Sequence, residues 1–267
     1  MRWRASARSL AAIALVFAAP ALAQRFRYDD AEDAPLPPGA EKEAEFSFAR
    51  LVYHNSTSGR WGLGGRWGRE SWHIDSPNAE RHFLQGVHRL TGIDARPMER
   101  YVTLTDDDVF KYPWLYAVEV GAWSFTDEEA ARLREYLDRG GFLVVDDFHG
   151  SYQWDGFVKG VRRIFPDRPI VEVPPDDPVF HVVYDVDEKV QIPGIRYLRT
   201  GTTYEQDGIQ PHWRGIYDDK GRLLLMINFN MDLGDAWEWA DDPEYPERWT
   251  ALAYRFGINY IVYSMTH

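Results

Sequence analysis

The chain has 267 residues, and its 30 Lys and Arg residues against 42 Asp and Glu residues give a formal net charge of −12. Hydrophobic residues make up 45% and charged residues 27%, a globular composition that argues against wholesale disorder and against a multi-span membrane protein. The acidic charge, without a dense Lys/Arg cluster, argues against a nucleic-acid-binding protein. Because the chain contains no cysteine, disulfides, thiolate nucleophiles and thiolate metal ligands are excluded.

Residues 1–23 have the pattern of a cleavable signal peptide. Three arginines precede an apolar run at residues 10–19, and alanines occupy the −3 and −1 positions before Gln24. The run is too short to span a bilayer, so we expect cleavage after Ala23 and no transmembrane segment in the mature chain. The pattern predicts a periplasmic or secreted protein.

The next segment, residues 24–45, is acidic, contains prolines and lacks apolar periodicity, which predicts a disordered linker. From residue 46 onwards, strand-like and helix-like segments alternate, and no second domain boundary is visible. We therefore expect residues 46–267 to form a single α/β domain with a partly parallel sheet and an antiparallel extension near the C-terminus.

The first strand of this domain is expected over residues 48–53. A helix should follow Ser76, with Ser76 as its N-cap, Pro77 at the first helical position and an apolar face that runs to Leu90. Later, Thr126 and Glu129 have the spacing of a capping box at the start of another helix. The remaining elements are expected as strands at 101–104, 115–118, 142–145 and 170–173, helices at 154–165 and 247–256, and a hairpin at 213–217 and 222–229.

Polar residues follow two of the expected parallel strands. His54 and Asn55 come after the first, and Asp146, Asp147 and His149 come after the strand at 142–145. Ligands of parallel sheets lie at the carboxyl ends of the strands, and paired carboxylates with a histidine suit a divalent cation or proton transfer. Asp146 and Asp147 could instead end the strand or cap the next helix. Adjacent strand residues point to opposite faces, so the two carboxylates would not by default reach the same ion.

A second polar group lies between residues 228 and 242. Asn230, Asp232 and Asp235 offer oxygen ligands that calcium prefers, but their spacing differs from the twelve-residue calcium loop, and an Asx-turn is the simpler interpretation. Four tryptophans could stack on a sugar ring or could pack in the core, namely Trp61, Trp67, Trp237 and Trp239.

Taken together, eight segments of this chain resemble domain of unknown function family 4159: FARLVYHN at 48, DSPNAERHFLQGVHRLTGIDARP at 75, YPWLYAVEVG at 112, EEAARLREYLDRGGFLVVDDFHG at 128, FPDRPIVEVP at 165, QIPGI at 191, NFNMDLGDAWEWADDPEYP at 228 and FGINYIVYSMTH at 256. The resemblance implies a flavodoxin-like three-layer sandwich, similar to class I glutamine amidotransferases, in a cell-envelope setting. It supplies no reaction. Since the amidotransferase cysteine is absent, glutamine hydrolysis through a thioester is excluded.

Three functions remain open. The first is a ligand-binding or interaction module of the cell envelope, with an envelope saccharide or an envelope protein as partner. The second is a metal-assisted hydrolase that uses His54, Asp146, Asp147 and His149. The third is a purely structural component of an envelope complex. The sequence identifies no particular cofactor.

Overall fold

The computed structural model describes residues 37–56 and 71–267 of the chain. Its main sheet contains, in spatial order, β3 (Arg100–Thr103), β1 (Ala49–Val52), β4 (Trp114–Val118), β6 (Phe142–Asp146), β9 (Leu223–Phe229), β8 (His212–Tyr217) and β7 (Val171–Glu172). The first five strands are parallel, and β8 runs antiparallel to both β9 and β7. A small antiparallel sheet pairs β2 (His54–Asn55) with β5 (Trp123–Ser124). The expected α/β class, with a mostly parallel sheet and an antiparallel extension, is confirmed.

The helices are α2 (Asn78–Leu90), α3 (Asp127–Asp138), α4 (Gly150–Ile164), α5 (Tyr197–Thr200), α6 (Leu233–Glu238) and α7 (Glu247–Thr266). Short 3-10 helices lie at Ser71–His73, Asp107–Lys111, Val120–Ala122 and Pro178–Phe180. Within the described ranges, no helix has the length and apolar character needed to cross a membrane.

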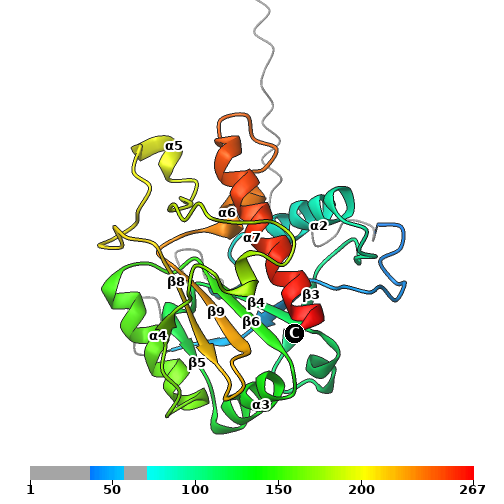
Figure 1. Ribbon diagram of the computed structural model, residues 1–267, viewed down its shortest axis with the longest axis vertical. Helices are drawn as coiled ribbons and strands as arrows, with labels where there is room; N and C mark the ends of the chain where they lie inside the picture. The colour runs from blue at the N-terminus through cyan, green and yellow to red at the C-terminus, as the bar shows by residue number, and fades with distance from the viewer. Residues whose placement is uncertain (1–36, 57–70) are drawn as a thin grey trace, which may run out of the picture. The chain divides into compact units, whose positions relative to one another are not determined.

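The sheet has a hydrophobic core on each face. Along β6, Phe142 and Val144 contribute to one core, and Leu143 and Val145 contribute to the other, because successive strand side chains point in opposite directions. Helices α2, α6 and α7 cover the first face, and α3 and α4 cover the second (Figure 1). Burial on both faces explains why β4 and β6 are continuously apolar up to their last residues.

The N-caps predicted from the sequence are correct for α3 and wrong for α2. In α3, the Thr126 side chain accepts from the Glu129 amide and the Glu129 side chain accepts from the Thr126 amide, so the expected capping box is confirmed. The expected Ser76 cap of α2 is wrong. The Ser76 hydroxyl instead lies 2.9 Å from the Tyr101 hydroxyl, and no side chain caps α2. Leu90, expected on the buried face of α2, is 54% exposed.

Two other helices are longer than expected because distant residues stabilise the additional turns. α4 begins four residues early, where its first amides donate to the side chains of Asn230 and Asp207. α7 continues ten residues beyond the expected end at Phe256. Gly257 makes this continuation compatible with packing, because a Cβ there would lie 2.5 Å from the Phe83 ring.

Residues just before the expected domain boundary at residue 46 already contact the domain. Ala40, near the end of the expected linker, is buried, and its carbonyl accepts a 2.8 Å hydrogen bond from Nε of Arg96. This part of the 24–45 segment therefore packs against the domain. The predicted signal peptide, residues 1–23, lies outside the described residues.

Candidate functional site

The carboxyl ends of the parallel strands carry an unusual set of backbone conformations. Glu119, Asp147 and Asn230 directly follow β4, β6 and β9, and each has a left-handed φ, between 51° and 64°. Asp75, in the loop before α2, has φ 63°. Non-glycine residues adopt this region uncommonly, Asn and Asp more often than others, and residues in such conformations cluster at functional sites.

Three of the carboxylates at this edge come together. Asp75, Asp147 and Asp232 are 5%, 8% and 4% exposed, and one oxygen from each lies within 4.8 Å of the others. Oxygens on opposite sides of one ion are about 4.2 Å apart for Mg²⁺ and about 4.8 Å apart for Ca²⁺, given their ordinary metal–oxygen distances. The three groups are therefore spaced as ligands of a single divalent cation.

The electrostatics of this cluster favour a cation strongly. Burial, followed by repulsion from the neighbouring carboxylates, raises the pKa of Asp75, Asp147 and Asp232 well above the ordinary value. Without a cation, the cluster can reduce its repulsion by retaining protons. A divalent cation would instead neutralise the carboxylates and allow them to ionise.

Asp147 is held in place by a chain of polar side chains. Its Oδ1 lies 3.1 Å from Nε2 of His149, and the His149 amide donates to Oε1 of Gln153. Gln153 in turn donates to Oε2 of Glu119 at 3.2 Å. Burial lowers the pKa of His149 to about 4, so the neutral ring donates through Nε2–H to Asp147 near pH 7. Metal-ligating groups are commonly oriented by partners of this kind.

Asp146 is not a member of the three-carboxylate cluster, and it organises the start of α6. Its Oδ2 accepts from the Tyr116 hydroxyl at 2.9 Å and from the amides of Leu233 and Gly234 at 2.7 and 3.1 Å. Burial raises its pKa to about 7. Asp146 was predicted to be a catalytic group, and its contacts show that it also positions the start of α6.

The late polar group divides into separate roles. Asn230 accepts from the Gly150 amide at 2.9 Å and donates to the Gln210 carbonyl at 2.7 Å, so it caps α4. Asp232 is the N-cap of α6 through the Asp235 amide, which agrees with the turn interpretation, and it also belongs to the carboxylate cluster. Asp235 lies in a second group with Asp75 and Glu238.

Trp237 and His54 are not part of the carboxylate cluster. Trp237 has no exposed surface and packs against Phe83 at 4.4 Å between ring centroids, so its indole is a core residue and offers no face to a sugar. Trp61 and Trp67 lie outside the described residues. His54 is exposed and lies 3.8 Å from Glu129, in the small sheet where Asn55 pairs with Trp123. Of the four side chains proposed for a hydrolase, Asp147 and His149 are in contact, whereas His54 contacts Glu129.

Comparison of the chain with known protein families identifies its family. The chain matches the family described as Domain of unknown function (DUF4159) over residues 47–265. The chain belongs to this family. The family resemblance inferred from the sequence is thereby confirmed. No curated protein matches the chain.

Three acidic residues at the candidate site were missed by sequence reasoning. Glu119 follows β4 directly, so the rule that selected Asp146 could have found it. Glu238 lies beside Trp237, which was selected, but nothing local distinguishes its carboxylate. Asp75 is far from β1 in the sequence and reaches the strand ends only through the fold, because the loop before α2 returns to that edge of the sheet.

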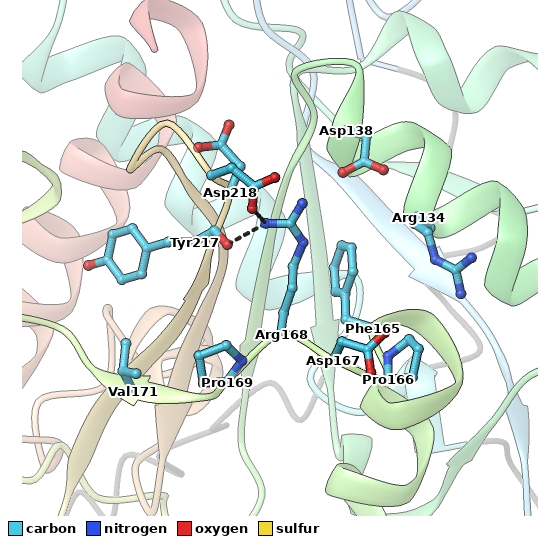
Figure 2. Close-up of a pocket in the computed structure, with 11 residues that line it drawn as sticks. Arg134, Asp138, Phe165, Pro166, Asp167, Arg168, Pro169, Val171, Tyr217 and Asp218 are labelled. Carbon is cyan, nitrogen blue, oxygen red and sulfur yellow. Dashed lines mark hydrogen bonds and ion pairs between the residues drawn. The ribbon is translucent and has the colours of Figure 1, made fainter.

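A cavity of about 690 Å³ lies at the other end of the sheet, near the start of β6 and β9. Figure 2 shows Arg168 among the residues that line it. Its guanidinium donates to the Tyr217 carbonyl at 2.9 Å and to Oδ1 of Asp219 at 3.1 Å. The guanidinium of Arg134 donates to the carbonyl of Arg163 at 3.1 Å. Both cationic side chains of this cavity already have partners, so the strand-end cluster remains the better candidate site.

Proposed function

We propose that this DUF4159 domain is a ligand-binding module of the cell envelope whose binding site is built around a divalent cation. The observation that carries the proposal is the buried convergence of Asp75, Asp147 and Asp232, with their oxygens within 4.8 Å of one another. A set of carboxylate oxygens is typical of Ca²⁺, Mg²⁺ or Mn²⁺ sites.

The charge balance supports a cation over a purely structural acidic cluster. Arg50 is a buried cationic side chain whose charge lowers the pKa of Asp75. It forms an ion pair with Glu80 and donates to the carbonyls of Trp72 and Ile74, both at 2.9 Å. Arg50 therefore has partners of its own. Several buried carboxylates without an equal number of cations are costly, and a bound divalent ion would remove that cost.

The scaffold supports the same proposal. We infer a flavodoxin-like sandwich related to class I glutamine amidotransferases, since helices cover both faces of a mostly parallel sheet and the site lies at the carboxyl ends of its strands. The absence of cysteine from the chain leaves this scaffold without a thiolate nucleophile. The signal-peptide pattern of residues 1–23 supports an exported protein, with an envelope saccharide or protein as its partner.

A thermal-shift experiment tests the cation site. The purified protein, stripped with a chelator, is titrated with Ca²⁺, Mg²⁺, Mn²⁺ and Zn²⁺, together with Asp147→Asn, Asp232→Asn and the control Asp155→Asn on the exposed side of α4. A cation at 100 times its dissociation constant stabilises the folded state by about 2.7 kcal/mol. We expect this gain in the wild type and the control but not in the two site variants. Equal gains in all four proteins would refute the site.

A metal-assisted hydrolase is the second candidate, favoured by one observation. Nδ1 of His149 is buried without a hydrogen-bond partner in the described part of the chain, while Nε2 contacts Asp147. A neutral imidazole in that arrangement could accept a proton from a water molecule. Hydrolysis of activated carboxylic or phosphoric esters that requires Mn²⁺ and is lost in His149→Gln would favour the enzyme, and cation binding without turnover would favour the module.

A further inference from the structure

Asp75 belongs to two groups of carboxylates at once. Besides its group with Asp147 and Asp232, it forms a second group with Asp235 and Glu238, whose ligand oxygens also lie within 4.8 Å of one another. Asp75, Asp147, Asp232 and Asp235 are buried, and Glu238 is partly buried. A carboxylate has two oxygens and can contact two cations, so a residue shared by two such groups has the position of a bridge.

The carboxylate of Asp75 is itself incompletely satisfied. Its Oδ2 is buried and has no hydrogen-bond partner among residues 37–56 and 71–267. This oxygen faces the first turn of α6, since a Cβ built on Gly234 would lie 2.5 Å from it. Gly234 lies between Asp232 and Asp235 in the sequence, so the unpartnered oxygen points to the turn that carries one carboxylate of each group. Buried polar atoms normally have partners, so a buried carboxylate oxygen without one is suited to contact a cation.

A second glycine preserves space between the two groups. A Cβ at Gly194 would lie 2.7 Å from Oδ2 of Asp232 and 2.9 Å from Oδ2 of Asp235. The backbone of Gly194 therefore lies against one carboxylate of each group. Any larger residue at this position would displace both side chains, whereas glycine leaves them free to turn towards bound cations.

Two divalent ions balance the charge of the ionised cluster better than one. The two groups together contain five carboxylates, and Arg50, the cationic side chain that acts on Asp75, is bonded to Glu80. One divalent cation would leave a surplus of three negative charges in a buried region. Two divalent cations would leave a surplus of one, which hydrogen bonds such as that from the Ile195 amide to Asp235, at 2.6 Å, can stabilise.

We propose that Asp75 bridges two divalent cations, one held with Asp147 and Asp232 and the other with Asp235 and Glu238. This inference rests on the proposed function and extends it from one cation to a pair. In two-cation sites the ions lie about 3.5–4 Å apart and together bind an anionic oxygen ligand such as a phosphate or carboxylate. The pair would let an acidic protein bind an anion at this edge of the sheet.

The experiment counts Mn²⁺ ions and measures their proximity. Equilibrium dialysis gives the number of bound ions per chain, and electron paramagnetic resonance distinguishes an isolated Mn²⁺, with its six-line spectrum, from two spin-coupled ions. The proteins are the wild type, Glu238→Gln, Asp147→Asn and Asp75→Asn, with Glu244→Gln as the matched control on an exposed glutamate. We expect two coupled ions in the wild type and control, one ion with a six-line spectrum in Glu238→Gln and in Asp147→Asn, and loss of the coupled pair in Asp75→Asn.

Each of the other possible results contradicts a specific part of the proposal. A single Mn²⁺ in the wild type that Glu238→Gln does not affect would overturn the second position and leave the proposed function intact. Two uncoupled ions would overturn the bridge. No bound ion in the wild type would refute the proposed function itself. Glu238 is partly exposed, so Glu238→Gln decides the count even if Asp75→Asn fails to fold, as judged by circular dichroism.

Discussion

Nε2 of His149 lies 3.1 Å from Oδ1 of Asp147, and both side chains are buried. The contact is formed because Asp147 leaves the extended conformation of β6, with φ 51°, so that its carboxylate turns towards the start of α4. Asp147 is thus oriented by a residue only two positions further along the chain. This contact, with the hydrogen bond from the Asp235 amide to Asp232, orients two of the three carboxylates of the candidate cation site.

The first prediction concerns this orientation. His149→Ala should weaken Mn²⁺ binding about 10–100-fold, the usual cost of losing a partner that orients a metal ligand. Isothermal titration calorimetry measures the change, and His181→Ala, which alters a histidine paired with Asp185, is the control. His149→Gln, which can still donate to Asp147, should recover part of the affinity. An unchanged affinity in His149→Ala would show that Asp147 is oriented by other contacts.

The second prediction concerns the pH dependence of stability without cations. Burial raises the pKa of Asp146 and Glu119 to about 7 and that of Glu238 to about 8. The folded state then holds protons that the unfolded state has released. The stability of the protein in the presence of a chelator should therefore fall as the pH rises from 6.5 to 8.5. Each such proton lowers the unfolding free energy by about 1.4 kcal/mol per pH unit while the folded state retains it, so the slope decreases above pH 7 for Asp146 and Glu119 and above pH 8 for Glu238.

The pH range of this prediction begins at 6.5 because His149 affects stability in the opposite direction at lower pH. Burial lowers the pKa of His149 to about 4, so its effect has the opposite sign: the unfolded state binds its proton more readily, and stability is lost as the pH falls towards 4. Above pH 6.5 that contribution is small. Thermal unfolding in a chelator at half-unit pH steps measures the trend, and a stability that rises from pH 6.5 to 8.5 would contradict the buried, protonated carboxyl groups.

The third prediction concerns the packing of α7. Gly257→Ala should destabilise the domain by about 1–3 kcal/mol, because the added Cβ would lie 2.5 Å from the Phe83 ring and 2.8 Å from Trp237. Gly92→Ala is the matched control, since no atom lies within 4 Å of its added Cβ, and its effect should stay within about 0.5 kcal/mol. Urea unfolding measures both. Equal stability of the two variants would show that α7 can shift away from Phe83.

The fourth prediction separates backbone strain from hydrogen bonding at Asn230. Asn230→Ala loses the side-chain bonds to Gly150 and Gln210 and places alanine at φ 64°, so we expect a loss of about 2–4 kcal/mol in the unfolding free energy. Asn230→Gly loses the same bonds but tolerates that φ, and should be about 1 kcal/mol more stable than the alanine variant. If the alanine variant proved the more stable, backbone strain would not be the deciding term.

Several elements were predictable because their signals are local. The capping box of Thr126 and Glu129, the apolar run of β6 and the hairpin of β8 and β9 each depend on neighbouring residues, and the structure has all three. Errors arose where a distant group acts on the element. The first turn of α4 depends on Asn230 and Asp207, and the last turns of α7 depend on Phe83 and Trp237.

The sequence by itself determined the α/β class and the acidic strand end at Asp146 and Asp147, because periodicity and capping are read from residues close together in the chain. It also determined the family, through the resemblance of its segments to that family. Only the tertiary structure decided which carboxylates meet. Asp75 and Asp232 are 157 positions apart, and they converge because the loop before α2 and the start of α6 both return to the carboxyl ends of parallel strands. That convergence in space makes a dispersed set of acidic residues a candidate cation site.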